Sequence, residues 1–525
     1  MQRISINNFK AIDDMTTFRS AAKYLRENPD TVLVLEKKTY LLRDEEACAL
    51  QRKVMRGDFT RNPEHHMFNP KFKYVIGIDL KGAKNVKIEG NGATLIFDGF
   101  MENISCQYCE NVEISDIIID LFRKAYTKGK IIKSGKILGA LPYIDADFGN
   151  LSLLSHRMPT LRMILNDTVK KRFVSVTGSF YAIRLSKSKF RFLGAMIRKE
   201  AQGADYVYLT NTYHYRPSIL IYEAVNTRII NVTIHSHCGM GIVGHRSKDI
   251  LLSGLKVMPS EGEAMSTNTD ATHFVSCSGL LRYENCYFEG HGDDASNVHT
   301  YYHTISSSEG NKCKLILKAP TWTHSQKLDY FYVGDTIELC KFEDLTPTDI
   351  YKVVSVKPDF DNLLQEVEFD KPLPINTNGY VMADVTQLPR LEFVNSKVFN
   401  HIARAILVKT RNVLIEGNTL DAHSFTGIHV AAEAYWREGV SSQNVIIRNN
   451  KILNYAIGIN VEISAEKPHL PIHKNISILN NLIETTGENN GIIARCVDGL
   501  TIKDNVIHSV KEPVFVQYCE NVIIE

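Results

Sequence analysis

Residues 412–420 read NVLIEGNTL, and the pattern returns as NVIIRNNKI from residue 444, NISILNNLI from residue 475 and GLTIKDNVI from residue 499. Each unit is a short alternating strand, a polar corner that contains Asn, and a second short strand. The units start 24 to 32 residues apart, which is typical of solenoid coils that stack only on their neighbours. This stretch predicts a parallel β-helix.

The alternation within each unit separates side chains that fill the coil from those that face solvent, because successive strand residues point to opposite faces. We expect four hydrophobic side chains of the first two units in the core: Val413, Ile415, Val445 and Ile447. Asparagines occupy one equivalent corner of every unit: Asn418, Asn450, Asn481 and Asn505. Asn tolerates left-handed backbone, and stacked amides can bond to one another. These corners therefore predict a structural ladder without a catalytic role.

Earlier segments follow the same pattern, among them NVKIEGNGATLIFDG from residue 85 and DILLSGLKV from residue 249. QYCENVEIS from residue 107 and QYCENVIIE from residue 517 are almost the same coil at distant positions. The pattern thus predicts an all-β protein in which one right-handed parallel β-helix runs through most of the chain. RSAAKYLREN from residue 19 predicts a short amphipathic helix that caps the first coil.

Two long stretches break this rhythm and are too long to be single loops. Both contain alternating runs, such as FVSVTGSFYAIRL from residue 173 and YFYVGDTIEL from residue 330, so each predicts a small antiparallel β-barrel inserted into the helix. Trp322 is expected to pack inside the second barrel. The predicted parts are 1–120 (cap and first coils), 121–225 (first barrel), 226–300 (central coils), 301–388 (second barrel) and 389–525 (last coils).

Composition and charge exclude several classes of protein. Hydrophobic residues make up 44% of the chain and charged residues 23%, the balance of an ordinary soluble globular protein. Lys and Arg (61) nearly cancel Asp and Glu (59), which argues against nucleic acid or an anionic membrane as partner. The first residues lack the apolar core of a signal peptide, and this absence predicts a cytoplasmic protein. A trimmed leader would instead mean secretion.

Acidic residues concentrate in two segments one coil apart. STNTDATHF carries Asp270, and the later segment EGHGDDASNVH carries Asp293 and Asp294. Asp270 and Asp293 are 23 residues apart, about one coil, and stacked coils lie ~4.8 Å apart, so these carboxyl groups should be neighbours. Adjacent residues of a regular strand face opposite ways, but Gly290 and Gly292 provide an irregular turn that lets both later aspartates face outward.

Carboxyl groups that crowd together repel, so at least one of the three should hold its proton near neutral pH. An acid catalyst needs that proton, while the other carboxylates stay ionised as bases. Inverting glycosidases divide the work in this way, with a gap between the carboxyl groups that admits a water molecule. A pair of aspartates can also form a solvated turn or bind calcium. The NTD motif one coil upstream favours a catalytic site.

These motifs also carry a family resemblance. NTD followed by GDD on the next coil resembles the polygalacturonase group of inverting glycosidases. The longer pair, TNTDATHF and ENCYFEGHGDDASNVHTYY, resembles glycoside hydrolase family 110, the exo-acting α-1,3-galactosidases. NVKIEGNGATLIFDG and AEAYWREG, from residue 432, match in the same order. The resemblance covers most of the chain, including both insertions.

The resemblance implies a pectin-lyase-like β-helix that releases terminal α-1,3-linked galactose with inversion, without metal or other cofactor. It implies that Asp293 is the general acid and that Asp270 and Asp294 activate the attacking water. The sequence departs from the family at DLFRKAYTKG, from residue 120, where a more acidic loop with proline is expected. The family's usual secretion signal is also missing.

Polar and aromatic residues near these motifs are candidates for binding a galactose-terminated oligosaccharide or glycan. An exposed Trp436 could stack on the apolar face of the sugar, and Lys409 is a weaker candidate. For several of these residues a purely structural role at the coil corners stays open. The predicted substrate-binding residues are Asn268, His273, His291, Asn297, His299, Arg404, Tyr435, Trp436 and Glu438. A homodimer is compatible with the sequence.

Two other functions remain open from the sequence. A polygalacturonase-like hydrolase would need a basic subsite for a uronate, and a lyase would need acidic calcium ligands with an Arg or Lys base. A glycan-binding β-helix without catalysis would need none of this chemistry, and the fold alone does not separate it from an enzyme.

Overall fold

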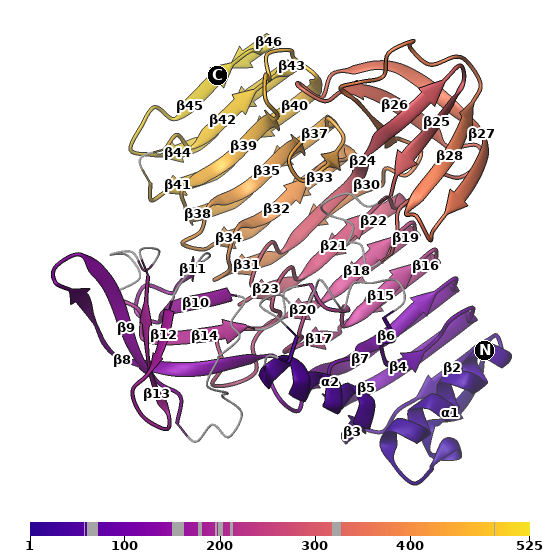
Figure 1. Cartoon of the computed structure of the whole chain (residues 1–525), viewed down its shortest axis with the longest axis vertical. Helices are drawn as coiled ribbons and strands as arrows, with labels where there is room; N and C mark the ends of the chain where they lie inside the picture. The colour runs from indigo at the N-terminus through magenta and orange to yellow at the C-terminus, as the bar shows by residue number, and fades with distance from the viewer. Residues whose placement is uncertain are drawn as a thin grey trace.

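The structure is a computed structural model in which stacked coils form one long solenoid with two side domains (Figure 1). Parallel strands line its faces, and each strand pairs in register with the strand of the next coil. The coils wind as a right-handed β-helix, the hand that connections between parallel strands adopt. The structure describes residues 1–56, 58–59, 72–149, 162–176, 181–194, 197, 203–210, 214–317, 327–487 and 489–525.

Two faces of the solenoid share one sheet, because the long strands β5 and β7 bend from one face to the other. The first face holds β1 (Gln2–Ser5), β2 (Thr31–Val34), β5 (Lys84–Asp98), β7 (Glu110–Leu121), β16 (Val225–Ile230), β19 (Lys248–Ser253), β22 (Ser278–Glu284), β30 (Arg390–Val394), β33 (Arg411–Glu416), β37 (Gln443–Arg448), β40 (His473–Leu479), β43 (Val497–Lys503) and β46 (Glu520–Ile524). The second holds β3 (Thr39–Arg43), β17 (Thr233–Ile234), β20 (Lys256–Val257), β23 (Tyr287–Glu289), β31 (Lys397–Phe399), β34 (Thr419–Asp421), β38 (Lys451–Tyr455), β41 (Leu482–Thr485) and β44 (Val506–His508).

The third face carries the predicted catalytic motifs. Its strands are β4 (Ile76–Asp79), β6 (Glu102–Gln107), β15 (Ile219–Tyr222), β18 (Ile242–His245), β21 (Thr272–Val275), β24 (Ser296–Glu309), β32 (Arg404–Val408), β35 (Thr426–Glu433), β39 (Ile457–Ser464), β42 (Ile492–Arg495) and β45 (Val514–Gln517). The short strand β36 (Glu438–Gly439) pairs antiparallel with β24, and so closes over this face.

The core lies inside the coils, where the alternating pattern placed it. The side chains of Val413, Ile415, Val445 and Ile447 are at most 3% exposed. The corner asparagines form the predicted ladder, in which the side-chain amide of each donates to the side-chain oxygen of the next at 2.9–3.0 Å. The ladder asparagines are Asn418, Asn450, Asn481 and Asn505.

Helix α1 (Asp14–Glu27) covers the first coils, as the sequence predicted, but it begins five residues earlier than residue 19. The side chain of Asp13 caps it by accepting from the backbone N–H of Thr16 at 2.6 Å. A second helix, α2 (Glu45–Arg56), was not predicted. Of the residues that the structure describes, none forms a helix both long and apolar enough to cross a membrane.

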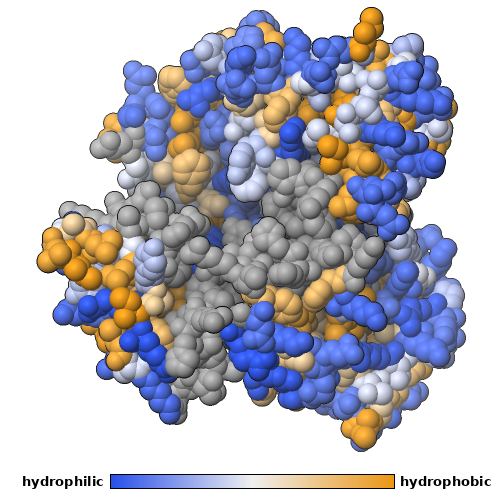
Figure 2. Space-filling model, in the orientation of Figure 1, coloured by the Kyte–Doolittle hydropathy of each residue, from blue (hydrophilic) through white to orange (hydrophobic). Residues whose placement is uncertain are grey.

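Antiparallel strands occupy both interrupted stretches. The first insertion is a seven-stranded sheet made of β8 (Tyr126–Ile137), β9 (Leu141–Asp147), β10 (Arg162–Asp167), β11 (Arg172–Val176), β12 (Tyr181–Arg184), β13 (Lys189–Leu193) and β14 (Tyr206–Thr210). Hydrophobic side chains gather over its outer end (Figure 2). Leu138, in the turn between β8 and β9, is 98% exposed.

The second insertion pairs in a ring that runs from β24 through β25, β28, β27, β26 and β29 and returns to β24. Its own strands are β25 (Lys312–Ile316), β26 (Thr336–Lys341), β27 (Pro347–Asp359), β28 (Leu364–Phe369) and β29 (Tyr380–Asp384). Trp322 lies outside the described residues. The barrel shape of the two insertions and the domain boundaries stay predictions.

Candidate active site

Two neighbouring loops on the third face bring the three aspartates together. Asp270 precedes β21, whereas Asp293 and Asp294 precede β24, and these two strands pair in parallel. One carboxylate oxygen of each residue lies within 4.8 Å of those of the other two. The pocket around them, of about 90 Å³, is lined by His214, Asp270, His273, Asp293, Asp294, Asn297, Arg404, Trp436 and Glu438.

Glycines allow the two loops to approach each other. A Cβ atom on Gly292 would lie 2.2 Å from the backbone oxygen of Asn268, a distance that no side chain can occupy. Gly290 has a φ of +72°, and a Cβ atom there would lie 2.4 Å from the backbone oxygen of Ala264. The irregular turn predicted from these glycines therefore lets Asp293 and Asp294 both contribute to the pocket.

Asp294 is held as a carboxylate by Arg404. The guanidinium donates to both carboxylate oxygens at 2.8 and 2.9 Å, and the Arg404 backbone N–H donates a third bond at 2.9 Å. Burial alone would raise the pKa of Asp294, but the charge and hydrogen bonds of Arg404 outweigh it and lower that pKa. Asp294 is therefore ionised at neutral pH.

Asp270 contacts a line of buried histidines. Its Oδ2 lies 2.5 Å from Nδ1 of His273, and Nε2 of His273 lies 2.8 Å from Nε2 of His299. The other carboxylate oxygen of Asp270 accepts from the backbone N–H of Asp294 at 3.3 Å. Asp270 is thus bonded on both of its oxygens.

A buried lysine joins the remaining charges behind the pocket. Lys409 Nζ forms an ion pair with Glu433 at 2.6 Å and a second one with Glu438. Burial alone would lower the pKa of Lys409, but the two glutamates outweigh it and raise that pKa. Glu433 also lies 3.5 Å from Arg404, and Glu438 lies 3.7 Å from His299. Ion pairs and hydrogen bonds therefore connect Asp270 and Asp294 into one buried polar network.

Asp293 is the most exposed of the three aspartates. Its backbone oxygen lies 2.8 Å from Nδ1 of His291, whose ring stacks on His401 at a centroid distance of 4.8 Å. Burial holds the pKa of His291 well below its usual range, so this ring is neutral. His291 thus supports the backbone of Asp293, and its predicted role in substrate binding stays a prediction.

The structure places the predicted substrate-binding residues in two groups. His273, Asn297, Arg404, Trp436 and Glu438 line the pocket. The others lie behind or beside it: Asn268 donates to the backbone oxygen of Ala125, His291 and His299 are buried, and Tyr435, 77% exposed, meets Trp436 edge to face. Their roles in binding sugar stay predictions.

Sequence reasoning missed three residues around the pocket. Glu433 lies inside the quoted segment AEAYWREG, so the motif contained the signal for it. His214 lines the pocket from a segment without repeat pattern, and nothing in the sequence marks it. Arg162 of the first insertion lies 3.5 Å from the backbone oxygen of Asn268, so that insertion supports the catalytic loop.

The spacing of the carboxyl groups differs from the expected one. An inverting site usually keeps acid and base ~6.5–9.5 Å apart so that a water fits between them. Here the nearest oxygens of the three carboxyl groups lie within 4.8 Å of one another, because the stacked loops superpose them. Distance alone therefore does not support inversion, and the stereochemistry rests on the resemblance.

Among the described residues, two sets of side chains bring potential metal ligands within 4.8 Å of one another: the three aspartates, and His273 with His299 and Glu438. Each set already faces a cation, since Arg404 pairs with Asp294 and Lys409 with Glu438. A nearby positive charge opposes a metal ion. The sequence-based expectation of a site without metal stays a prediction.

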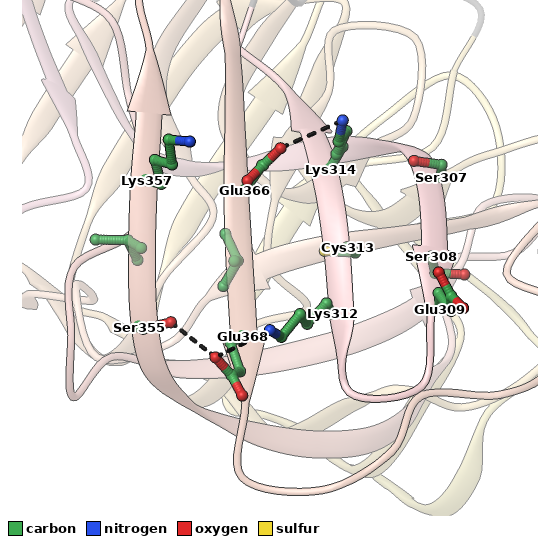
Figure 3. Close-up of a pocket in the computed structure, with 12 residues that line it drawn as sticks. Ser307, Ser308, Glu309, Lys312, Cys313, Lys314, Ser355, Lys357, Glu366 and Glu368 are labelled. Carbon is green, nitrogen blue, oxygen red and sulfur yellow. Dashed lines mark hydrogen bonds and ion pairs between the residues drawn. The ribbon is translucent and has the colours of Figure 1, made fainter.

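A larger hollow, of about 460 Å³, lies on the second insertion (Figure 3). Its charged side chains pair with each other across the sheet, Lys314 with Glu366 at 3.2 Å and Lys312 with Glu368 at 3.7 Å. Exposed pairs of this kind are screened by water and contribute little. The chemistry of the smaller aspartate pocket therefore identifies the candidate site better than size does.

Comparison with known proteins supports the resemblance seen in the motifs. The chain is 25% identical to alpha-1,3-galactosidase B of Bacteroides thetaiotaomicron over 517 residues, which cover 87% of this chain and 80% of the relative. It is 27% identical to alpha-1,3-galactosidase A of Bacteroides fragilis over 477 residues, 82% of this chain and 75% of the relative. The chain is a homologue of the α-1,3-galactosidases. The resemblance to the α-1,3-galactosidases that the sequence motifs indicated is therefore confirmed.

Solved structures give a looser likeness to this α-1,3-galactosidase homologue. An exopolygalacturonase from Thermotoga maritima matches with a TM-score of 0.42 and 12% identity, over 100% of this chain and 92% of the other. A family 28 exopolygalacturonase from Yersinia enterocolitica matches with a TM-score of 0.40 and 11% identity, over 99% and 78%. The fold assignment rests on the strand registers themselves. No family model matches the chain.

Proposed function

We propose that this protein is an exo-acting glycoside hydrolase that releases terminal α-1,3-linked galactose from a glycan. The observation that carries the proposal is the aspartate pocket, where Asp270, Asp293 and Asp294 bring carboxylate oxygens within 4.8 Å of one another. The names of the homologous proteins support the galactose specificity. The small volume of the pocket, about 90 Å³, fits one terminal sugar better than an extended chain.

The environments of the three aspartates support different roles. Asp294 is fixed as a carboxylate by Arg404 and is best suited to stabilise positive charge that develops on the sugar ring. Asp270 shares its Oδ2 with His273 and serves as the base toward water. Asp293 is the most exposed of the set, and its neighbour Asp294 is ionised, so a retained proton on Asp293 makes it the general acid.

The charges around the pocket support a neutral substrate. Arg404 is paired with Asp294 and Glu433, and Lys409 is paired with Glu433 and Glu438. A uronate would need a cation that is available to its carboxylate, and both of these cations are committed to protein carboxylates. A neutral galactose needs only hydrogen bonds and an aromatic surface, which Asn297 and Trp436 offer at the pocket.

The proposal is tested by incubating the protein with galactose linked α-1,3, α-1,4 and α-1,6 and measuring released monosaccharide. Galactose should appear from the α-1,3 compound first, and added chelator should not reduce the rate. Release of an unsaturated uronate, detected by its absorbance, with restoration of activity by calcium would favour a lyase instead. Tight glycan binding without any product would favour a binding protein. Cytoplasmic location and a homodimer stay predictions, which fractionation and light scattering can test.

A further inference from the structure

Asp270, His273 and His299 form a line of buried contacts that ends on the protein backbone. Asp270 Oδ2 lies 2.5 Å from His273 Nδ1, and His273 Nε2 lies 2.8 Å from His299 Nε2. His299 Nδ1 then lies 3.1 Å from the backbone oxygen of Thr300. All three residues are at least 96% buried, so water cannot easily enter between these atoms.

Each of these three contacts joins two atoms that would repel each other without a proton between them. A neutral imidazole carries one proton on one of its two nitrogens, and a carbonyl oxygen carries none. His273 and His299 as neutral rings thus provide two protons for three contacts. The third proton must come from a protonated Asp270 or from a doubly protonated ring. This count is the same wherever along the line the extra proton sits.

We propose that Asp270, His273 and His299 together hold one proton more than two neutral imidazoles, so that Asp270 adds no net negative charge to the pocket. His299 is the positioning residue of this arrangement, because its Nδ1–H is fixed by the Thr300 carbonyl and its Nε2 must therefore accept from His273. The inference deepens the proposed function, since it assigns the charge state in which Asp270 meets its substrate.

The surroundings of His299 favour the extra proton at the Asp270 end of the line. Burial lowers the pKa of His299 to about 3, in spite of the nearby Glu438, so this ring is neutral at physiological pH. The extra proton then lies between His273 and Asp270, and Asp270 acts as the base when this proton is on His273 Nδ1. The other titratable and charged groups that face the line or the pocket are Asp293, Asp294, Arg404, Lys409, Glu438 and His214.

The extra proton has a consequence for catalysis. Without it Asp270 would place a full negative charge within 4.8 Å of a carboxylate oxygen of Asp293. That charge would raise the pKa of Asp293, and the loss of the shared proton would raise the pKa of Asp270 itself. Both limbs of the pH profile of kcat/KM would then move to higher pH, by about 1 to 2 pH units, the size of shift that a neighbouring charge produces.

Two substitutions of His299 separate this role from a structural one. In His299→Asn the amide still donates to Thr300, but the acceptor opposite His273 is removed, so His273 can be neutral with its proton on Nδ1. In His299→Gln the amide reaches the former Nε2 position. Glu438, 3.7 Å from that position, attracts the amide NH2, and the amide oxygen turns toward His273 and still accepts.

We expect both pH limbs to shift upward in His299→Asn and to stay near the wild-type positions in His299→Gln. His473→Asn is the matched control, because His473 is buried and, within the part of the chain that the structure describes, its ring hydrogen-bonds only to backbone groups of Ser442 and Glu462. It should leave the limbs unmoved. If His299 only supports the fold, both of its variants lose activity at every pH with unshifted limbs, and the proposal is overturned.

Histidine NMR tests the proton count without substrate, so its outcome does not depend on the proposed hydrolase activity. In 15N-histidine-labelled wild-type protein we expect three hydrogen-bonded protons on this line, the two at His273 assigned by their loss in His273→Asn and the one between His299 Nδ1 and Thr300 by its loss in His299→Asn. In His299→Asn the proton on Nε2 of His273 should be absent, whereas the proton between Nδ1 of His273 and Oδ2 of Asp270 remains. Only two protons in the wild type, or an Nε2 proton of His273 that persists in His299→Asn, would overturn the proposal.

Discussion

Corners of the last coils and corners of the central coils belong to the same β-helix, but the former are regular and the latter irregular. At the last coils Asn418, Asn450 and Asn481 repeat one residue at the corner between the first and second faces, and each amide bonds to the next. At the corner between the second and third faces of the central coils, Gly290 and Gly292 allow two loops to approach closely, and buried charges gather there. Regularity in this fold therefore marks stability, and the departure from it marks the candidate chemistry.

The largest expected effect is a loss of kcat when the Asp293 carboxyl group, at the irregular corner of the central coils, is replaced. Asp293→Asn should lower kcat by about 10²- to 10⁴-fold, the usual contribution of a general acid, with unchanged thermal unfolding. The loss should be greatest on substrates with poor leaving groups and least on aryl galactosides, which need no protonation. Equal losses on both kinds of substrate would move the acid role to Asp270 or Asp294.

The prediction from the sequence was strongest where the pattern repeats. The core positions of Val413 and Ile415 and the asparagine ladder follow from spacing alone, since each coil repeats the same local rule. Asp270 and Asp293 were paired for the same reason, by their separation of one coil. Sequence therefore predicts well the contacts that the coil register dictates.

Contacts between segments that do not share the coil register could not be predicted. Glu438 meets Lys409 because β36 folds back over the third face, and no spacing rule encodes that return. His214 approaches the pocket from the end of the first insertion.

Removing the guanidinium of Arg404 should have the second largest effect, a loss of stability. Arg404→Met leaves the carboxylate of Asp294 buried and unpaired, which costs about 3–5 kcal/mol of stability at pH 7. Because Arg404 holds the pKa of Asp294 below its usual range, the stability from this pair is present at neutral pH and is lost as pH falls through that lowered pKa. Urea unfolding should show that the variant has lost this acid-side dependence. Equal unfolding free energies at pH 7 would contradict it.

A smaller loss of stability should follow when the ladder is interrupted. Asn450→Ala leaves the buried Asn418 amide without its acceptor, and one unsatisfied group costs about 1–3 kcal/mol. The kcat for galactose release should stay at the wild-type value, because the ladder lies away from the aspartate pocket. Thermal unfolding measures the stability of this variant, and initial rates measure its kcat. A drop in kcat with unchanged stability would contradict the structural role assigned to the asparagine ladder.

The smallest effect is expected at the rim of the pocket. Trp436 is 41% exposed and lines the pocket, whereas Tyr435 is 77% exposed beside it. Trp436→Ala should raise KM through loss of sugar stacking, by about 5- to 30-fold for an interaction of ~1–2 kcal/mol, with little change in kcat. Tyr435→Ala serves as the matched control and should change KM less. An equal rise in both would mean that the turn is needed only for its shape.

The most direct measurement of the central claim follows the anomer of galactose released from an α-1,3-linked galactoside by proton NMR, for the wild type and for Asp293→Asn. The wild type should release β-galactose first, before mutarotation, and Asp293→Asn should release almost none. α-Galactose as the first product would replace direct attack by water with a covalent intermediate on one of the aspartates. No galactose from the wild type, or undiminished release by Asp293→Asn, would contradict hydrolysis at the aspartate pocket.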